Sequence, residues 1–197
     1  MACDALLIAA AVEFADKSQR RPAYSWQRQF RLRIPVHGPS KWNEPKVSDA
    51  LHDAVSFLTG DNWTIEFYER TKPMDQPHQG SLNLPAEVDA VIPFSNGLDS
   101  CAVAGIMGRC LGDRLVRVRL GSKRRDGREL TRKGIPFTAV PYEVKKGARS
   151  FVESSARSRG FKFALISGLA AFLANAKEVI VPESGQGALG PTLAAVG

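Results

Sequence analysis

The residues best suited to chemistry form the hexapeptide Ser95-Asn96-Gly97-Leu98-Asp99-Ser100. It follows a short apolar run, residues 88–94, and precedes a stretch suited to a helix, residues 98–111. A turn from a strand into a helix presents backbone N–H groups without helical partners, together with the positive end of the helix dipole. A phosphate group fits such a turn. The sequence therefore predicts a phosphate-binding loop here.

Each residue type in this loop has a physical reason to be there. Gly97 lets the backbone approach a ligand closely or adopt a positive φ. Ser95 and Ser100 add hydroxyl donors, and Asp99 can hold a Mg²⁺ ion that the phosphates also bind. The Gly-Lys-Ser/Thr ending of a Walker A loop is missing. The alternative interpretation is a capped polar turn without a ligand, because Asn-Gly and Asp-Ser are common turn and N-cap residues.

The elements before the loop predict a small α+β region over residues 1–80. Residues 5–16 and 47–59 are suited to helices by composition or apolar spacing, and residues 30–34 and 63–69 are typical of strands. We expect the two strands to form an antiparallel pair that the two helices cover. Four prolines or glycines within residues 71–87 then indicate a linker.

The pattern of apolar residues changes after this linker, and residues 86–197 are expected to form a second domain. Strand-like apolar runs alternate there with helical stretches, which favours an α/β fold with βαβ units and a parallel sheet. The predicted strands are residues 88–94, 115–120, 139–144 and 178–181, and the predicted helices are residues 98–111 and 160–176.

The charge of the chain is concentrated in one segment. The 197 residues carry a net charge of +7, and residues 113–133 hold nine basic and three acidic side chains. This segment suits an anionic partner. Nucleic acid is one such partner, but it is not favoured, because residues 115–136 contain no aromatic side chain to stack on bases.

Several classes of protein are excluded by composition. No apolar run approaches the roughly 18 residues of a membrane span, so we expect no membrane partner. Three cysteines cannot build a disulfide framework or a four-thiolate zinc site, which favours the cytoplasm. Cys101 and Cys110 are expected to be buried, inert thiols.

The loop and two later segments resemble a known family. Residues 94–100 resemble the Ser-Gly-Gly-x-Asp-Ser pyrophosphate loop of the N-type ATP pyrophosphatases, with Asn96 in place of the first glycine. Residues 157–161 and 179–189 look like the QueC group, the 7-cyano-7-deazaguanine synthases, and more closely like QatC, the QueC-like component of bacterial anti-phage systems. The resemblance implies a Rossmann-like PP-loop domain preceded by a smaller N-terminal region.

The resemblance also implies a reaction. ATP and Mg²⁺ would bind the loop, with pyrophosphate on Ser95 to Ser100, including Asn96, Gly97 and Leu98, and the metal on Asp99. A deazaguanine-type carboxylate would be adenylated, and ammonia or an amine would then displace AMP; the amine of a protein is a further acceptor in the defence-type relatives. Asp99 and Ser100 would be catalytic. The other implied site residues are Arg159 for ATP and Glu183, Gly185 and Gly187 for the substrate.

This sequence differs from the family in two ways, and each limits what the resemblance implies about the protein. The chain lacks the cysteine cluster that holds zinc near the C-terminus of the biosynthetic synthases, so zinc is not expected. It also ends at Gly197, soon after the Glu-x-Gly-x-Gly stretch, where family members continue, which favours a fragment. Two alternatives stay open: a catalytically degenerate ATP-binding subunit and a basic nucleic-acid-binding module. Other proteins of a defence operon are the expected protein partners.

Overall fold

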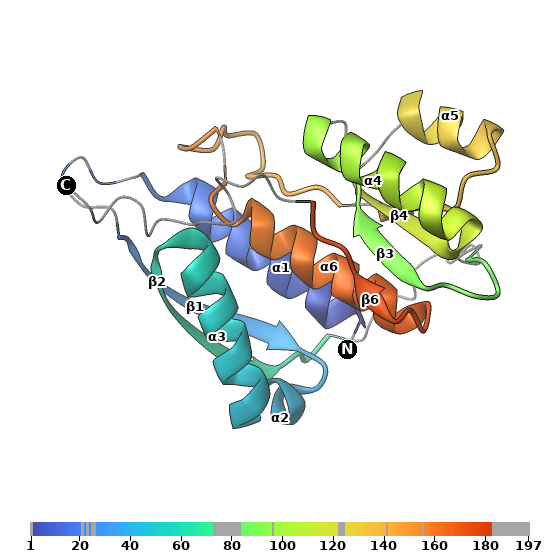
Figure 1. The fold of residues 1–197 in the computed structure, drawn as a ribbon. Coiled ribbons are helices and arrows are strands. Elements are labelled where there is room, and N and C mark those ends of the chain that lie inside the picture. The colour runs from blue at the N-terminus through green and yellow to red at the C-terminus, as the bar shows by residue number, and fades with distance from the viewer. Residues whose placement is uncertain are drawn as a thin grey trace, which may run out of the picture. The chain divides into compact units, whose positions relative to one another are not determined.

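The computed structural model divides the chain into two compact units, each of which mixes helices with parallel strands (Figure 1). The first unit contains Met1–Gln79 and Val144–Ile166, and the second contains Gly80–Glu143 and Ser167–Gly197. No helix in the described part of the chain is both long and apolar enough to cross a membrane. The structure describes residues 2–20, 22, 24, 27–72, 84–95, 97–121, 125–140, 142–154 and 156–182.

Within the described residues of Met1–Gln79, the first unit contains two strands and three helices. In chain order these are α1 (Ala2–Ser18), β1 (Gln29–Val36), α2 (Pro39–Trp42), α3 (Pro45–Thr59) and β2 (Asn62–Glu69). The strands pair in parallel, from Gln29 opposite Asn62 to Val36 opposite Glu69. The predicted antiparallel pair is therefore wrong. Helices α2 and α3 form a crossover that returns the chain to the end where β1 began, so β2 runs in the same direction.

The core of the first unit lies on one face of this small sheet. Phe30, Ile34, Trp63 and Phe67 are buried, whereas the residues between them along each strand are mostly exposed. The Phe30 and Trp63 rings stack with their centroids 4.1 Å apart. Helix α1 contacts β1 and α3 contacts β2, and they contribute the buried side chains Ile8, Ala9, Val12, Leu51 and Val55. The period-2 pattern thus places the strands, and the helices cover the apolar face.

A buried ion network also stabilises the first unit. The side chain of Arg28 is 0% exposed and donates to carboxylate oxygens of both Asp16 and Asp61, each at 2.5 Å from Nη2. Its Nε bonds to Asp61, and its Nη1 donates to the backbone oxygens of Asp16 and Gln19. Every N–H of the guanidinium therefore has an acceptor, which is the condition for burying a charge.

Residues 157–162 complete this network from far along the chain. The N–H of Ser158 donates to Oδ2 of Asp16 at 2.8 Å, and Arg157 Nη1 lies 3.2 Å from Oδ1 of Asp61. Lys162 Nζ donates to Glu13 at 2.9 Å. The predicted division placed these residues in the C-terminal domain, but hydrogen bonds to Asp16, Asp61 and Glu13 join them to the first unit. Helix α6 (Arg159–Leu173) consequently begins in the first unit and ends in the second.

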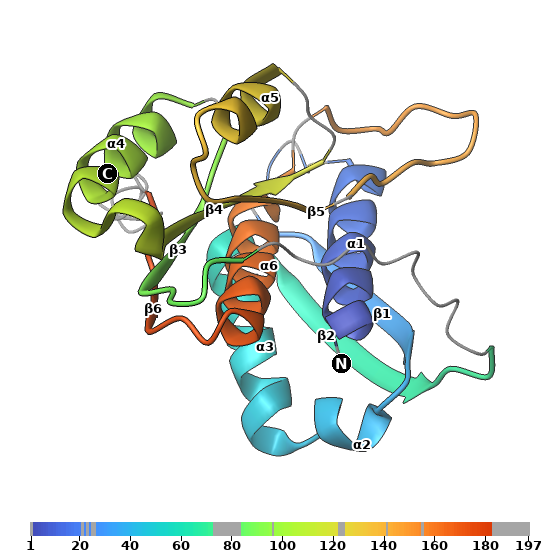
Figure 2. The ribbon, with the colours of Figure 1, turned by 90° about the vertical axis from the view of Figure 1, so that its right-hand side faces the viewer.

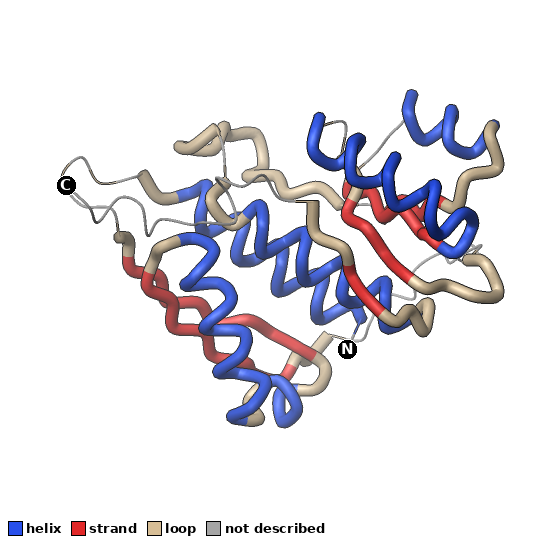
Figure 3. Tube along the Cα trace, viewed as in Figure 1, coloured by secondary structure: helices blue, strands red, loops and turns tan. Residues whose placement is uncertain are grey.

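The second unit holds a four-stranded sheet with the order β5-β4-β3-β6. Figure 3 draws the strands in red. All three strand pairs are parallel, which confirms the predicted parallel sheet. Its elements, besides the end of α6, are β3 (Ala90–Pro93), α4 (Leu98–Leu111), the 3-10 turn η1 (Gly112–Arg114), β4 (Leu115–Leu120), α5 (Arg125–Arg132), β5 (Phe137–Val140) and β6 (Glu178–Val179).

Both faces of this sheet are covered. Val91, Val116 and Val118 pack with Ala171 of α6 on one face. Ala90, Ile92 and Leu115 pack with Ala104 of α4 on the other. Figure 2 shows α4 and α6 beside these strands. Because β3 is buried on both faces, its sequence is a continuous apolar run instead of an alternating one.

Ion pairs of one carboxylate connect the starts of three strands. Asp89 precedes β3 and forms ion pairs with Arg114, which precedes β4, and with Lys177, which precedes β6. Hydrogen bonding to Lys177 is the main reason that the pKa of Asp89 lies below its usual value, and the charge of Arg114 adds to the effect. The carboxylate therefore stays ionised at neutral pH and holds the edge of the sheet opposite the candidate loop.

Candidate functional site

The predicted phosphate loop lies where the strand order of the second unit reverses. From β3 the chain passes through α4 to β4 on one side, whereas β6 pairs with β3 on the other side. In an open parallel sheet, ligands bind outside the carboxyl ends of the strands at such a switch point. Ser95 lies two residues after Pro93, the last residue of β3, and Gly97 is the N-cap of α4. The topology thus places the loop at the edge where this fold class binds ligands.

Hydrogen bonds within the loop hold its shape. The Oγ atoms of Ser95 and Ser100 lie 2.7 Å apart, and the N–H of Gly97 donates to Ser95 Oγ at 3.2 Å. Ser100 Oγ also lies 3.4 Å from the backbone nitrogen of Ser95 and 3.4 Å from the carbonyl oxygen of Gly97. The two serines therefore brace the turn from inside. Ser100 is only 6% exposed, so its main observed role is to position the loop.

Gly97 is required because a side chain would be crowded at this position, not because its backbone conformation is unusual. Its φ of −72° and ψ of 151° are open to any residue, so the predicted alternative of a positive φ is not realised. A Cβ at this position would lie 3.2 Å from Ser95 Oγ and 3.7 Å from Ser100 Oγ. A side chain would therefore press on the hydrogen bonds that shape the loop.

The first turn of α4 offers backbone donors to an anion. The N–H of Cys101 makes a helical bond to the carbonyl oxygen of Gly97 at 3.1 Å, so the amides of Leu98, Asp99 and Ser100 precede that bond. Gly97 is the N-cap residue and makes no side-chain cap. Such a terminus carries donors and a partial positive charge, and both attract phosphate.

Asp99 is exposed in this first turn. Mg²⁺ typically binds proteins through one or two carboxylates, with phosphate oxygens and waters as its remaining ligands. An accessible carboxylate in the predicted phosphate loop fits that pattern. Across the described ranges, no group of three or more His, Cys, Asp or Glu side chains comes together as a metal site.

The other predicted site residues are divided between the two units. Arg159 is exposed at the first position of α6, in the first unit, with its guanidinium 5.7 Å from the ring centre of Phe163. The loop belongs to the second unit. Leu98, within the loop, is 85% exposed. The predictions for Asn96, Glu183, Gly185 and Gly187 lie outside the described residues.

The prediction of buried cysteines is wrong for the helix that follows the loop. Cys101 and Cys110 are both exposed on α4. Only Ser100 and Ala104 of that helix are buried, so most of its surface faces outward. Its high content of small and apolar residues suggested deeper burial than the packing provides.

Sequence reasoning also missed a buried cation in the basic segment. Arg117 on β4 is only 8% exposed and donates to the carbonyl oxygen of Ala104 at 3.2 Å. Burial lowers the pKa of its guanidinium. A Cβ on Gly108 would lie 2.8 Å from Nη2 of Arg117, so the glycine makes room for it. The sequence feature that could have indicated this burial is an arginine on the inward side of a strand, with apolar residues on both sides of it along the chain.

Comparison of the chain with models of known families, with curated proteins and with solved structures finds no match. Function is therefore inferred from the residues and from their arrangement in space.

Proposed function

We propose that the loop of residues 95–100 binds the pyrophosphate part of ATP and that the protein adenylates a deazaguanine-type carboxylate. The observation that carries this proposal is the braced loop at the carboxyl end of β3. It combines backbone donors at the start of α4 with the exposed carboxylate of Asp99. The motif resemblance and the switch-point topology support the same nucleotide chemistry.

The proposed chemistry needs no protein nucleophile. An oxygen of the substrate carboxylate attacks the α-phosphorus of ATP, and the bond from that phosphorus to the oxygen bridging to the β-phosphate breaks. Pyrophosphate leaves, and an acyl-adenylate forms. The nitrogen of ammonia or an amine then attacks the acyl carbon and displaces AMP.

The loop would stabilise the leaving pyrophosphate. Negative charge develops on this group in the transition state, and N–H donors that are already in position stabilise it without reorganising. The amides at the start of α4 are such donors, and the Ser95–Ser100 hydrogen bond holds the turn in which they lie. Asp99 would hold Mg²⁺, which neutralises phosphate charge when it is bound. We place this activity in a cytoplasmic anti-phage system with other proteins as partners.

The experiment is ATP–pyrophosphate exchange with 7-carboxy-7-deazaguanine as the substrate. We expect exchange with the unaltered chain and a loss of at least 100-fold in Asp99→Asn, because the metal-binding carboxylate is removed while the size is kept. Asp113→Asn is the matched control, since Asp113 is also exposed but lies beyond the far end of α4. Equal exchange in Asp99→Asn and in the unaltered chain would refute the site.

The two alternatives predict different results in the same assay. A degenerate subunit, which the replacement by Asn96 would favour, binds ATP but gives no exchange. A nucleic-acid-binding module gives no exchange and binds duplexes with a strong dependence on salt. The contacts of the basic segment disfavour the latter, because Arg114 pairs with Asp89, Lys133 pairs with Glu129 and Arg117 is buried.

A further inference from the structure

Strand β2 has an outer edge with which no described strand pairs. The first unit's sheet contains only β1 and β2 within the described residues. The N–H groups of Asn62 and Arg70 both donate to β1 or its flanks, at Arg28 and Val36. Backbone groups alternate in direction along a strand, so the even-numbered amides of β2 face β1 and the odd-numbered ones face away. The backbone of Ile65 accordingly points toward the outer edge.

The hydrogen bond of Asn43 supports this assignment. Its side-chain Nδ2 donates to the carbonyl oxygen of Phe67 at 3.0 Å, from the turn between α2 and α3. An odd-numbered carbonyl of β2 thus already accepts a hydrogen bond from a group outside the sheet. No described residue supplies such a partner to the backbone N–H of Ile65.

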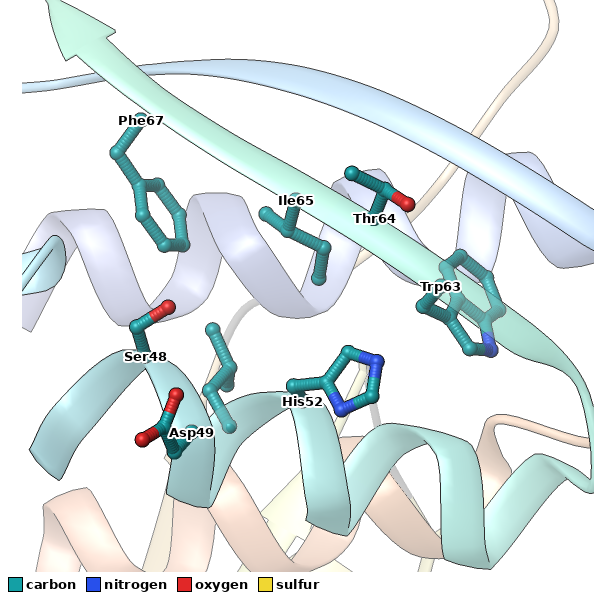
Figure 4. Close-up of a pocket in the computed structure, with 8 residues that line it drawn as sticks. Ser48, Asp49, His52, Trp63, Thr64, Ile65 and Phe67 are labelled. Atoms are coloured by element: carbon teal, nitrogen blue, oxygen red, sulfur yellow. The ribbon is translucent and has the colours of Figure 1, made fainter. Parts of the chain in front are cut away.

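A pocket runs along this part of β2, between the strand and α3 (Figure 4). Its volume is about 390 Å³. Ile65 and Phe67 point from the strand toward α3, and His52 points from α3 toward Trp63 (Figure 4). The apolar lining residues are Leu51, Trp63, Ile65 and Phe67, and the polar ones are Ser48, Asp49, His52 and Thr64.

We propose that this groove binds an extended peptide, which adds a strand to the outer edge of β2. An exposed sheet edge supplies main-chain hydrogen bonds to an added strand, and side-chain pockets beside it supply specificity. Every second side chain of the added strand would point toward α3 and fill the space between Leu51 and Ile65. Residues of α3 line the pocket beside this edge, so a side chain of the added strand can contact the helix.

The charge of the lining selects the kind of peptide. Asp49 is an exposed carboxylate on α3, and the lining contains no lysine or arginine. A peptide with a lysine or arginine next to its apolar anchors therefore complements the groove, whereas an acidic peptide is repelled. The occupant is thus an extended segment in which apolar and basic side chains alternate.

Two synthetic peptides test the charge selection. One alternates valine with lysine and the other alternates valine with glutamate, and each carries fluorescein for anisotropy with the full chain. We expect the lysine peptide to bind at least tenfold more tightly. Asp49→Lys should reverse this preference, whereas Asp113→Lys should keep it, because Asp113 is an exposed acid of the second unit and does not line the pocket. Failure of both peptides to bind below 1 mM would overturn the proposal.

Hydrogen exchange tests the added strand itself. Saturation with the lysine peptide should slow the exchange of the Ile65 amide at least tenfold, since that N–H gains an acceptor. Ile65→Pro removes the outward donor without removing a bond to β1, so it should weaken peptide binding while the unit stays folded. If this variant unfolds, the hydrogen exchange of the Ile65 amide in the unaltered chain still tests the proposal. Unchanged exchange at Ile65 in the bound state would refute strand addition, and a dimer that Ile65→Pro dissociates would assign the edge to a second copy instead.

Discussion

The hydroxyl oxygens of Ser95 and Ser100 lie 2.7 Å apart across the turn that joins β3 to α4. This contact connects the end of a buried strand to the first turn of a helix, and the amide of Gly97 bonds to the same Ser95 hydroxyl. The shape of the loop therefore depends on side-chain hydrogen bonds made within it. The same two hydroxyls were predicted to donate to a phosphate. In the structure they hold the turn instead, because they bond to each other and that of Ser95 also accepts from the amide of Gly97.

The Ser95–Ser100 pair should show energetic coupling. We expect Ser95→Ala and Ser100→Ala each to lower the free energy of unfolding, and the double variant to cost less than their sum by about 0.5–1.5 kcal/mol, the value of one hydrogen bond. Urea unfolding followed by circular dichroism measures this coupling. Strict additivity would show that the contact contributes no stability.

Two glycines of α4 should respond differently to alanine. At Gly105 a Cβ meets nothing within 4 Å, so Gly105→Ala should stabilise by about 0.5–1 kcal/mol through helix propensity. At Gly108 the Cβ would lie 2.8 Å from Arg117 Nη2, so Gly108→Ala should destabilise by roughly 1–3 kcal/mol as the buried guanidinium loses its acceptor.

Thermal unfolding of the two variants measures this difference. In an Arg117→Met background the space conflict disappears, and Gly108→Ala should then stabilise as Gly105→Ala does. If Gly108→Ala still destabilises in that background, the guanidinium is not the cause.

Removal of Asp61 should destabilise the first unit strongly. Asp61→Ala leaves the fully buried Arg28 paired with Asp16 alone and removes the carboxylate that accepts from its Nε and Nη2, at a cost of about 3–5 kcal/mol. Glu66→Ala is the control, because its ion pair with Arg33 is well exposed and should be worth about 0–1 kcal/mol. All three tryptophans of the chain lie in residues 1–79, so tryptophan fluorescence during urea unfolding reports on this unit. Equal effects of the two substitutions would contradict the network.

Asp4 should make the first unit sensitive to acid. Burial works to raise the pKa of Asp4, but hydrogen bonds from His37 and Trp42 outweigh it, so the pKa in the folded state lies below the usual value. The unfolded chain then binds more protons, and stability rises with pH through this range. The contribution of Asp4 is complete above the unfolded pKa of about 3.9 and is lost as the pH falls through the lower folded value.

Comparison with Asp4→Asn measures this contribution. The variant should be less stable by about 1.5–3 kcal/mol at pH 7, the range for hydrogen bonds to a charged group. The difference between the two proteins should shrink as the pH is lowered toward 3. Asp53→Asn, at an exposed position on α3, is the control and should change the free energy of unfolding by no more than about 0.5 kcal/mol. If the difference in the free energy of unfolding between Asp4→Asn and the unaltered protein stays constant across this pH range, the loss of stability comes from the changed side-chain shape and not from the lost charge.

Local sequence pattern was sufficient to predict most elements and the position of the loop. The continuous apolar run before Ser95 indicates a strand buried on both faces, and the small residues after Gly97 indicate a helix, so a strand–turn–helix followed from neighbours along the chain. The parallel sheet of the second unit followed from the alternation of such elements. These inferences held because they depend on period and turn chemistry, which are local properties.

Strand direction and unit boundaries depended on contacts that no local pattern contains. The β1–β2 pair is parallel because α2 and α3 cross over between the strands, and residues 144–166 join the first unit because Asp16 and Asp61 bind Ser158 and Arg157. The burial of Arg117 likewise depends on Gly108 of a different element. The sequence by itself determined where the strands, the helices and the candidate loop lie along the chain. Only the tertiary structure decided which of them meet, because pairing and burial arise from residues that are distant in sequence and close in space.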